Sequence, residues 1–92
     1  MSSDQPVEGE FTVGSELGLH ARPAGRFVAV AGRFDGEIEV SRGHEWVSGT
    51  SVLSILSLAA AKGTVLRIKA RGVDAERAVA ELGALIEATD ES

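Results

Sequence analysis

The sequence TVLRIKAR at residues 64–71 decides which architecture the rest of the chain can adopt. Its apolar residues Leu66, Ile68 and Ala70 alternate with cationic residues, which is typical of a β-strand with one buried and one wet face. Beyond residue 74 the apolar residues recur three and four positions apart, which is the period of a helix. They are Ala78, Val79, Leu82, Leu85 and Ile86. A one-faced strand followed by an amphipathic helix predicts a helix packed on a sheet.

The same two periods recur towards the N-terminus. Further strands are expected at residues 10–13, 37–40 and 46–47, and further helices at residues 23–33 and directly after Ser51. The second of these helices is expected to end at Lys62-Gly63, because glycine favours the left-handed conformation that terminates helices. The order β-α-β-β-α-β-α predicts an α+β fold, an open-faced β-sandwich. In it three helices cover one face of a four-stranded antiparallel sheet.

Length and composition indicate one globular domain. The chain has 92 residues, of which 43% are hydrophobic and 25% charged. We expect a flexible lead-in at residues 1–9, the domain at residues 10–88 and a frayed tail at residues 89–92. The chain has no cysteine, which excludes disulfides and thiolate metal sites and favours a reducing, cytoplasmic location.

Charge and motif content argue against several classes of protein. A formal net charge of −5 disfavours nucleic acid as a partner, because its phosphates must be neutralised by clustered cations. The polar first ten residues hold no apolar run that would act as a signal peptide or membrane anchor. Neither a phosphate-binding loop of the Walker kind nor a carboxylate cluster is present, so we expect no metal and no nucleotide cofactor.

One short segment carries the candidate chemistry. His20 follows Gly18 in a loop and precedes Arg22 and Pro23 at the expected start of a helix. A neutral imidazole is a nucleophile near neutral pH, and a helix N-terminus with an arginine beside it favours a phosphate group. The plain alternative is a surface histidine that only caps the helix. His44 lies in an expected hairpin turn and lacks these neighbours, which weakens its claim to be the nucleophile.

The second expected helix has two features of its own. Ser51 stands where an N-cap hydroxyl is expected. Apolar residues follow on more than one helical face, so some of them must be exposed or bound by a partner. Those of interest are Val52, Leu53 and Leu56. A single exposed leucine would need no explanation, whereas a patch beside an anion site suggests an interface.

The segments GLHARPA at residues 18–24 and SVLSILSLAAAKG at residues 51–63 resemble the HPr family, the histidine-containing phosphocarriers of the bacterial phosphotransferase system. The resemblance extends over residues 10–88, and the family's open-faced β-sandwich agrees with the element order above. It implies that His20 accepts phosphate at Nδ1 from phosphorylated Enzyme I and passes it to an Enzyme II A-type domain. Arg22 would steady the phosphoryl group and Pro23 would fix the helix start.

The resemblance also implies a regulatory site and a docking surface. Ser51 is similar to the serine that HPr kinase/phosphorylase modifies in many relatives, although a cap alone would also explain it. A phosphate there would be tolerated at the helix N-terminus and would act by repelling an acidic partner. The implied partner surface comprises Leu19, Val52, Leu53 and Leu56. The resemblance implies a carrier and not an enzyme, with no cofactor, and we expect a monomer.

This chain departs from better-known relatives around the site. Leu17 replaces a small polar residue that can contact the active histidine. Lysines of the relatives are replaced by neutral residues at four positions, namely Ala29, Gly32, Thr50 and Ser54. Arg26 and Arg33 could compensate in part. Three functions therefore stay open: a carrier for sugar uptake, a regulatory phosphoprotein of a nitrogen-related or serine-kinase-sensing branch, and an interaction module without chemistry.

Overall fold

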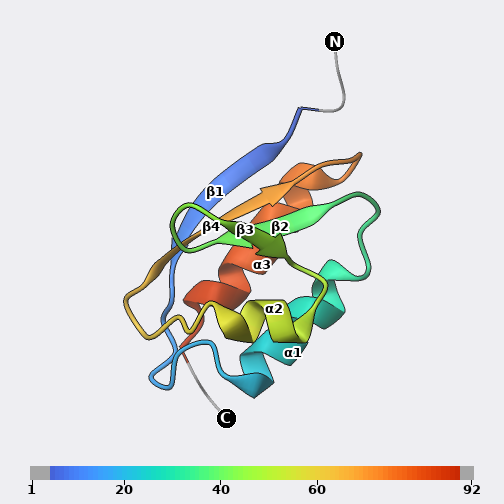
Figure 1. Cartoon of the computed structure of the whole chain (residues 1–92). Coiled ribbons are helices and arrows are strands. Elements are labelled where there is room, and N and C mark those ends of the chain that lie inside the picture. Colours follow the sequence, from blue (N-terminus) through green and yellow to red (C-terminus); the bar gives the residue numbers. More distant parts are fainter. Residues whose placement is uncertain (1–4, 90–92) are drawn as a thin grey trace.

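A computed structural model describes residues 5–89 of the chain. Its elements follow the predicted order of strands and helices (Figure 1). They are β1 (Val7–Thr12), α1 (Ala21–Ala31), β2 (Ile38–Ser41), β3 (Trp46–Ser48), α2 (Val52–Ser57), β4 (Val65–Ala70) and α3 (Ala75–Glu87). No helix within these described residues is long and apolar enough to cross a membrane.

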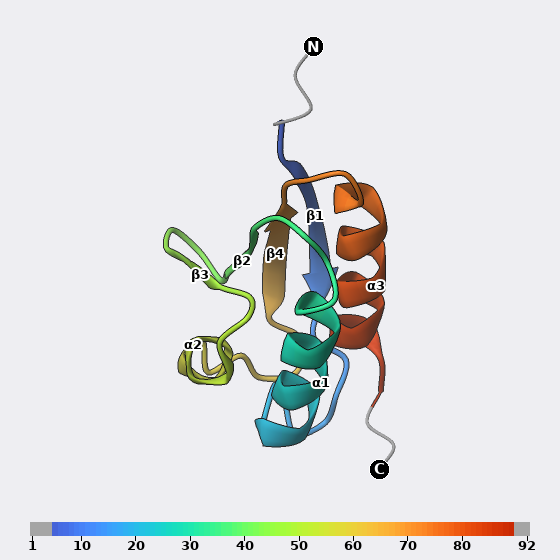
Figure 2. The same ribbon diagram turned by 90° about the vertical axis from the view of Figure 1, so that its right-hand side faces the viewer.

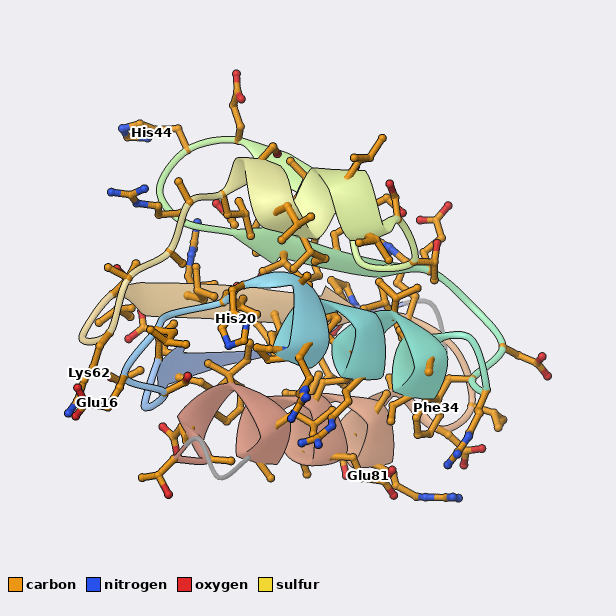
Figure 3. The ribbon with its side chains drawn as sticks, turned by 90° about the horizontal axis from the view of Figure 1, so that it is seen from below. Glu16, His20, Phe34, His44, Lys62 and Glu81 are labelled. Atoms are coloured by element: carbon orange, nitrogen blue, oxygen red, sulfur yellow. The ribbon has the colours of Figure 1, made fainter. Side chains whose placement is uncertain are left out.

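The four strands form one antiparallel sheet in the order β1-β4-β2-β3. The last strand of the sequence, β4, lies between β1 and β2, and its Ile68 pairs with Gly9 on one side and Val40 on the other. The connection from β1 to β2 contains α1, and the connection from β3 to β4 contains α2. The predicted open-faced β-sandwich is confirmed, because the three helices cover one face of this sheet (Figure 3).

The core lies between the inward face of the sheet and the helices. Leu66, Ile68 and Ala70 of β4 are fully buried, as the strand pattern predicts. In the view from below, α1 lies between α2 and α3 (Figure 3), and α3 packs along β1 and β4 (Figure 2). Phe27 of α1 and Leu82 of α3 fill the space between the layers. Each such buried side chain contributes about 1.5–3 kcal/mol.

The first strand begins at Val7 and not at Glu10. Residues 7–9, which the sequence predicts to be part of a flexible lead-in, are therefore in the sheet, with Val7 paired to Ala70. The alternation of apolar and polar side chains does not indicate this first part of the strand, because Gly9 has no side chain to contribute to it. The rest of the predicted lead-in at residues 1–4, and residues 90–92 of the predicted tail, lie outside the described residues.

The second helix ends earlier than predicted. It stops at Ser57 with Leu58 as its C-cap, and Ala59 adopts the left-handed conformation with φ 50°. Gly63 has φ 91°, but it lies in the turn into β4, where its N–H donates to the Val13 carbonyl oxygen at 2.9 Å. The expected helix terminator at Lys62-Gly63 is thus wrong. Tertiary contacts hold a non-glycine residue in the terminating conformation instead.

The opposite face of the sheet carries the cations of β4. The Lys69 Nζ lies 4.1 Å and the Arg67 Cζ 4.9 Å from the centroid of the Trp46 ring. Both cations also approach carboxylates on neighbouring strands, Lys69 that of Glu39 at 3.5 Å and Arg67 that of Glu8 at 3.8 Å. This face is therefore polar but well ordered, as the alternation predicts for the wet side of a strand.

Candidate functional site

His20 is the N-cap residue of α1. Its backbone is extended, with φ −85° and ψ −168°, and its carbonyl oxygen accepts the first helical bond from the Ala24 N–H at 3.0 Å. Its side chain forms no capping bond to the helix. The N–H groups of Ala21 and Arg22 precede the first helical bond and are free to bind an anion beside the imidazole.

Pro23 lies in the first turn of α1, as predicted, but it is the third helical residue because the helix begins at Ala21. A proline has no N–H, and the N–H at this position has no intrahelical partner in any case. The helix also ends at Ala31, two residues before the predicted Arg33. The local sequence therefore fixes where the imidazole stands relative to the helix axis.

The loop that leads to His20 makes a close turn at Gly18. The His20 N–H donates to the Gly18 carbonyl oxygen at 2.9 Å, and Gly18 has φ 74°. A Cβ at this glycine would lie 2.6 Å from the Ala60 carbonyl oxygen. Only glycine combines this left-handed conformation with such a close approach of two backbone segments.

The same loop is fastened to the segment between α2 and β4. The Leu19 N–H donates to the Ala60 carbonyl oxygen at 2.9 Å, and Lys62 Nζ lies 2.8 Å from Glu16 Oε2 (Figure 3). The hydrogen bond and charge of Lys62 lower the pKa of the Glu16 carboxyl below its ordinary value of 4.5. Both side chains are largely exposed, so the backbone bonds and not this ion pair hold the loop.

The two nitrogens of the His20 ring differ in their surroundings. Nε2 is buried and has no hydrogen-bond partner among the described residues. The ring lines a shallow depression together with Leu17, Leu19 and residues 59–61. Nδ1 is not among the buried side-chain atoms and forms no hydrogen bond within the described residues, so it keeps contact with solvent. Only one nitrogen of the ring can therefore reach a reacting group.

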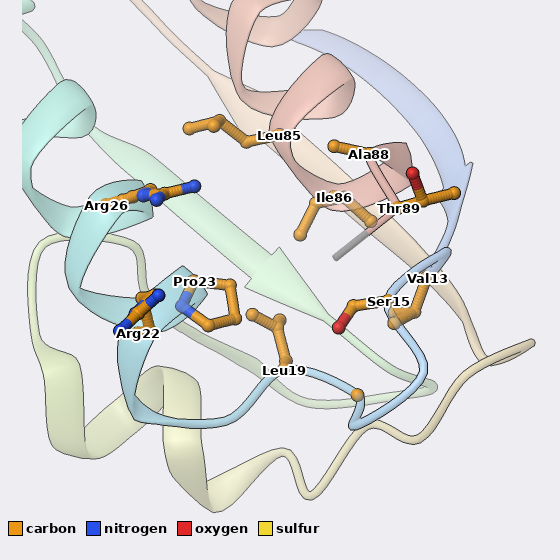
Figure 4. A pocket seen from close by; sticks show the side chains of 11 residues that line it. Val13, Ser15, Leu19, Arg22, Pro23, Arg26, Leu85, Ile86, Ala88 and Thr89 are labelled. Atoms are coloured by element: carbon orange, nitrogen blue, oxygen red, sulfur yellow. The ribbon is translucent and has the colours of Figure 1, made fainter. Parts of the chain in front are cut away.

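Arg22 and Arg26 line, together with Leu19, a cavity of about 40 Å³ between α1 and the end of α3 (Figure 4). Neither guanidinium has a hydrogen-bond or ion-pair partner among residues 5–89. The Ser15 hydroxyl also lines this cavity and is buried without a partner. The Arg22 side chain is thus free to turn towards an anion beside the His20 ring.

Ser51 is the N-cap of α2, as predicted, and its hydroxyl accepts the Ser54 N–H at 3.2 Å. The side chains after it are exposed on the surface: Leu53 by 79% and Val52 by 38%. Leu56 is partly buried against the core. The predicted apolar surplus of this helix is confirmed for Val52 and Leu53.

Leu19 does not belong to the predicted partner surface. Its side chain is 7% exposed and packs in the core, because the backbone bond to Ala60 turns it inward. Leu17, two residues before it, is instead 71% exposed beside the His20 depression. His44 lies in the β2–β3 hairpin, away from His20, and its residue is exposed (Figure 3).

The sequence analysis missed three contributors to the site. Ala59 and Ala60 form the wall behind the imidazole, and Arg42 donates to the carbonyl oxygens at the end of α2. No local pattern marks them, since each acts on residues far away in the sequence. Among residues 5–89 no group of three His, Asp or Glu side chains is arranged to hold a metal ion. The arrangement offers one exposed nucleophilic nitrogen, free backbone donors and an arginine side chain without a partner among residues 5–89.

Comparisons with known proteins agree on one family. Residues 7–88 match the family profile described as the PTS HPr component phosphorylation site. The phosphocarrier protein HPr of Pseudomonas aeruginosa is 43% identical over 79 residues, which cover 85% of this chain and 84% of that protein. The phosphocarrier protein NPr of Shewanella violacea is 35% identical over 82 residues, covering 89% and 90% of the two chains.

The fold leads to the same group. The crystal structure of an HPr from Bacillus anthracis superposes with a TM-score of 0.85 at 35% identity, covering 90% of this chain and 99% of that one. The matched region begins at Val7, the first residue of β1. The fold also places a histidine with an exposed nitrogen at the N-terminus of a helix that covers this sheet. The chain therefore belongs to the HPr family of phosphotransferase-system phosphocarriers.

Proposed function

We propose that Nδ1 of His20 accepts a phosphoryl group from phosphorylated Enzyme I and passes it to an Enzyme II A-type domain. The observation that carries this proposal is the asymmetry of the ring: Nε2 is buried, whereas Nδ1 faces solvent at the N-cap of α1. The neutral ring with its proton on Nε2 leaves the lone pair of Nδ1 available for attack on phosphorus.

The transfer balances without a cofactor. A bond forms between Nδ1 and phosphorus as the bond between phosphorus and the phosphorylated residue of the donor breaks, and at the acceptor the bond to Nδ1 breaks as the bond to the acceptor residue forms. Arg22 and the free N–H groups of Ala21 and Arg22 stabilise the charge on the phosphoryl oxygens. The chain is modified covalently and regenerated, so it acts as a carrier and not as an enzyme that turns over a substrate alone.

The exposed apolar side chains beside His20 form the docking surface, which we define as Leu17, Val52 and Leu53. An apolar patch next to a charged site is typical of a protein interface, where desolvated side chains carry most of the binding energy. The same patch serves donor and acceptor in turn, because both must reach one nitrogen atom. A monomer in the cytoplasm, with no other copy covering this face, is the form suited to that exchange.

Ser51 is proposed as a regulatory site for a serine kinase such as HPr kinase/phosphorylase. A phosphate there adds about 1.5–2 negative charges at the N-terminus of α2, next to the exposed Val52 and Leu53. The helix tolerates this charge, but an acidic partner docking on the patch is repelled. Ser51→Asp should therefore slow phosphorylation of His20 and leave the fold intact. An unchanged transfer rate in that variant would argue against the switch.

The decisive experiment follows acid-labile phosphate on the chain after incubation with phosphoenolpyruvate and Enzyme I. Wild type and His44→Ala should be phosphorylated, whereas His20→Ala should not, because only His20 has its nitrogen beside a helix N-terminus. His44→Ala is the matched control, since it removes the other histidine of the chain. Equal labelling of wild type and His20→Ala, or labelling of neither, rejects the carrier function and leaves an interaction module.

A second candidate function is a regulatory phosphoprotein of a nitrogen-related branch. It is supported by the 35% identity to the NPr of Shewanella violacea over nearly the whole chain. Both functions use His20, so they differ only in the acceptor. Phosphorylated wild type should be mixed with sugar-specific and nitrogen-related acceptor domains in parallel, and the phosphate followed. Transfer to the nitrogen-related acceptor alone would replace sugar uptake as the function.

A further inference from the structure

We propose that Arg42, on the β2–β3 hairpin, is a positioning residue for His20. The inference rests on the proposed function, because it names a residue that holds the phosphoryl acceptor in place without touching it. Arg42 and His20 belong to different elements and are 22 positions apart (42 − 20). Two contacts and the backbone conformation of Ala59 connect them.

The first contact is between the hairpin and the end of α2. Arg42 Nη1 donates to the Leu58 carbonyl oxygen at 2.8 Å and to the Ala59 carbonyl oxygen at 3.3 Å. These carbonyls lie at the negative end of the helix, where a guanidinium is favourable. The hairpin is itself held by a bond from the Gly43 N–H to the Ser41 hydroxyl at 3.1 Å, so Arg42 projects from an ordered turn.

The second link is the conformation of Ala59. Among the residues the structure describes, it is the single non-glycine residue with positive φ, at 50°. A side chain with a Cβ adopts this conformation only when its surroundings compensate the steric cost. Arg42 Nη1, which donates to both the Leu58 and the Ala59 carbonyl oxygen, makes the tertiary interaction that spans this residue. Among residues 5–89, no other side chain hydrogen-bonds to the backbone of residues 58–60, so without Arg42 no side-chain bond keeps Ala59 left-handed.

The third link joins this segment to the imidazole. The Ala60 carbonyl oxygen, next in the chain, accepts the Leu19 N–H at 2.9 Å, directly before His20. Residues 59–61 line the depression in which the ring lies, with Nε2 buried. A shift of this segment would therefore move both the wall behind the ring and the backbone on which His20 is mounted.

A purely structural cap on α2 would make a different prediction. It would stabilise the fold, and its loss would lower the free energy of unfolding without altering the reactivity of His20. A positioning residue also controls the geometry of Nδ1, and a small displacement of a nucleophile slows group transfer strongly while leaving partner docking alone. Arg42 lies outside the docking surface of Leu17, Val52 and Leu53, so its loss should not weaken binding directly.

The experiment compares wild type, Arg42→Ala and Arg77→Ala in phosphoryl transfer from phosphorylated Enzyme I. Arg77 is the matched control, because it is an exposed arginine on α3 whose interactions are with Glu81 and the Phe34 ring and not with residues 15–20 or 58–61. We expect Arg42→Ala to lower kcat about tenfold with KM changed less than twofold. The Leu19 amide should exchange with solvent faster, and the nitrogen signals of the His20 ring should shift. Arg77→Ala should match wild type in all three measurements.

The outcomes test the carrier function of the protein and the positioning role of Arg42 separately. A wild type that accepts no phosphate rejects the proposed function, while Leu19 exchange in Arg42→Ala still tests the contact chain. A folded Arg42→Ala with wild-type kcat and unchanged Leu19 exchange overturns the positioning role, even if the variant is less stable. If Arg42→Ala does not fold, Arg42→Lys decides. It keeps the charge but replaces the guanidinium donor by a flexible ammonium group of different reach, so kcat should fall about threefold, and a wild-type value rejects the inference.

Discussion

The helices α3 and α2 use apolar residues in opposite ways. α3 has 13 residues and buries six of them against β1, β4 and α1. α2 has six residues and buries only Ile55, while Leu53 is 79% exposed. Packing along its whole length holds α3. By contrast, α2 packs mainly through Ile55 and is also held at its two ends, by the Ser51 cap and by Arg42. If partners dock on the exposed side of α2, as proposed above, stability and docking are carried by different helices, and mutations should separate them.

The largest effect is expected in the packed helix. Leu82→Ala removes a fully buried side chain of α3 and should lower the free energy of unfolding by about 2–5 kcal/mol, measured by urea denaturation. The same truncation at Leu53 of α2 should change it by less than about 0.5 kcal/mol. Equal losses from the two truncations would show that the helices do not differ in this way.

A methyl group added to α3 tests how closely it packs. Gly83→Ala would gain about 1 kcal/mol of helix propensity, but its Cβ would lie 2.1 Å from Cε1 of the Phe11 ring. The overlap should dominate, so we expect a net loss of about 1–2 kcal/mol in the free energy of unfolding. The double variant Gly83→Ala, Phe11→Leu should lose less free energy of unfolding than the sum of the losses in the two single variants. Simple additivity would mean that the ring moves aside freely.

The cap of α2 should matter less than the packing of α3. Ser51→Ala removes the acceptor for the Ser54 N–H and should lower the free energy of unfolding by about 1 kcal/mol. Ser51→Asp keeps an acceptor at that position and should retain most of the stability. Ser57→Ala is the control within the same helix, because its hydroxyl bonds only to the Ser54 carbonyl of its own helix. A loss in Ser57→Ala as large as in Ser51→Ala would contradict the role of the cap.

The exposed side of α2 should affect binding rather than stability. Leu53→Ala should raise the Kd for Enzyme I about tenfold, which corresponds to about 1.4 kcal/mol. Titration calorimetry measures this directly. Val73→Ala is the matched control, because Val73 is 90% exposed but lies in the turn before α3. If both variants bind like wild type, the docking surface lies elsewhere.

The smallest effect concerns the exposed ion pair beside the loop. Lys62 lowers the pKa of Glu16, so the pair stabilises the fold above pH 4.5 and loses this contribution as pH falls below that value. Lys62→Gln should therefore lower the Tm slightly at pH 7 and not at pH 3. Added salt should shrink the difference at pH 7, since both groups are exposed. A difference that persists at pH 3 would have another origin.

The fold was largely predictable from residue periodicity. The alternation of β4 and the helical stripe of α3 act locally, so the sequence pattern is enough to indicate them. The end of α2 was not predictable in this way. Its Ala59 terminator depends on Arg42, 17 positions earlier, and a glycine at position 63 offered a plausible but incorrect alternative. Where a distant side chain sets a backbone conformation, local propensity misleads.

In the candidate site, too, features set by neighbouring residues were predictable, whereas features set by tertiary contacts were not. His20, Pro23 and Ser51 were predicted at helix starts, because caps are encoded by neighbouring residues. Leu19 was assigned to the partner surface, but a loop has no period from which the direction of a side chain can be read. Its inward turn depends on Ala60, which lies 41 positions later (60 − 19). Residue type and spacing indicate the candidate reacting group, and tertiary hydrogen bonds decide its surroundings.

The burial of one ring nitrogen of His20 also limits how fast the carrier can work. With one accessible nitrogen, donor and acceptor cannot be bound at the same time, and each cycle includes two dissociation steps. A throughput of about 100 per second then requires a dissociation rate at least that large. At an association rate of about 10⁷ M⁻¹s⁻¹, the Kd for each partner must stay above about 10 µM. Tighter docking on α2 would make this protein a slower carrier.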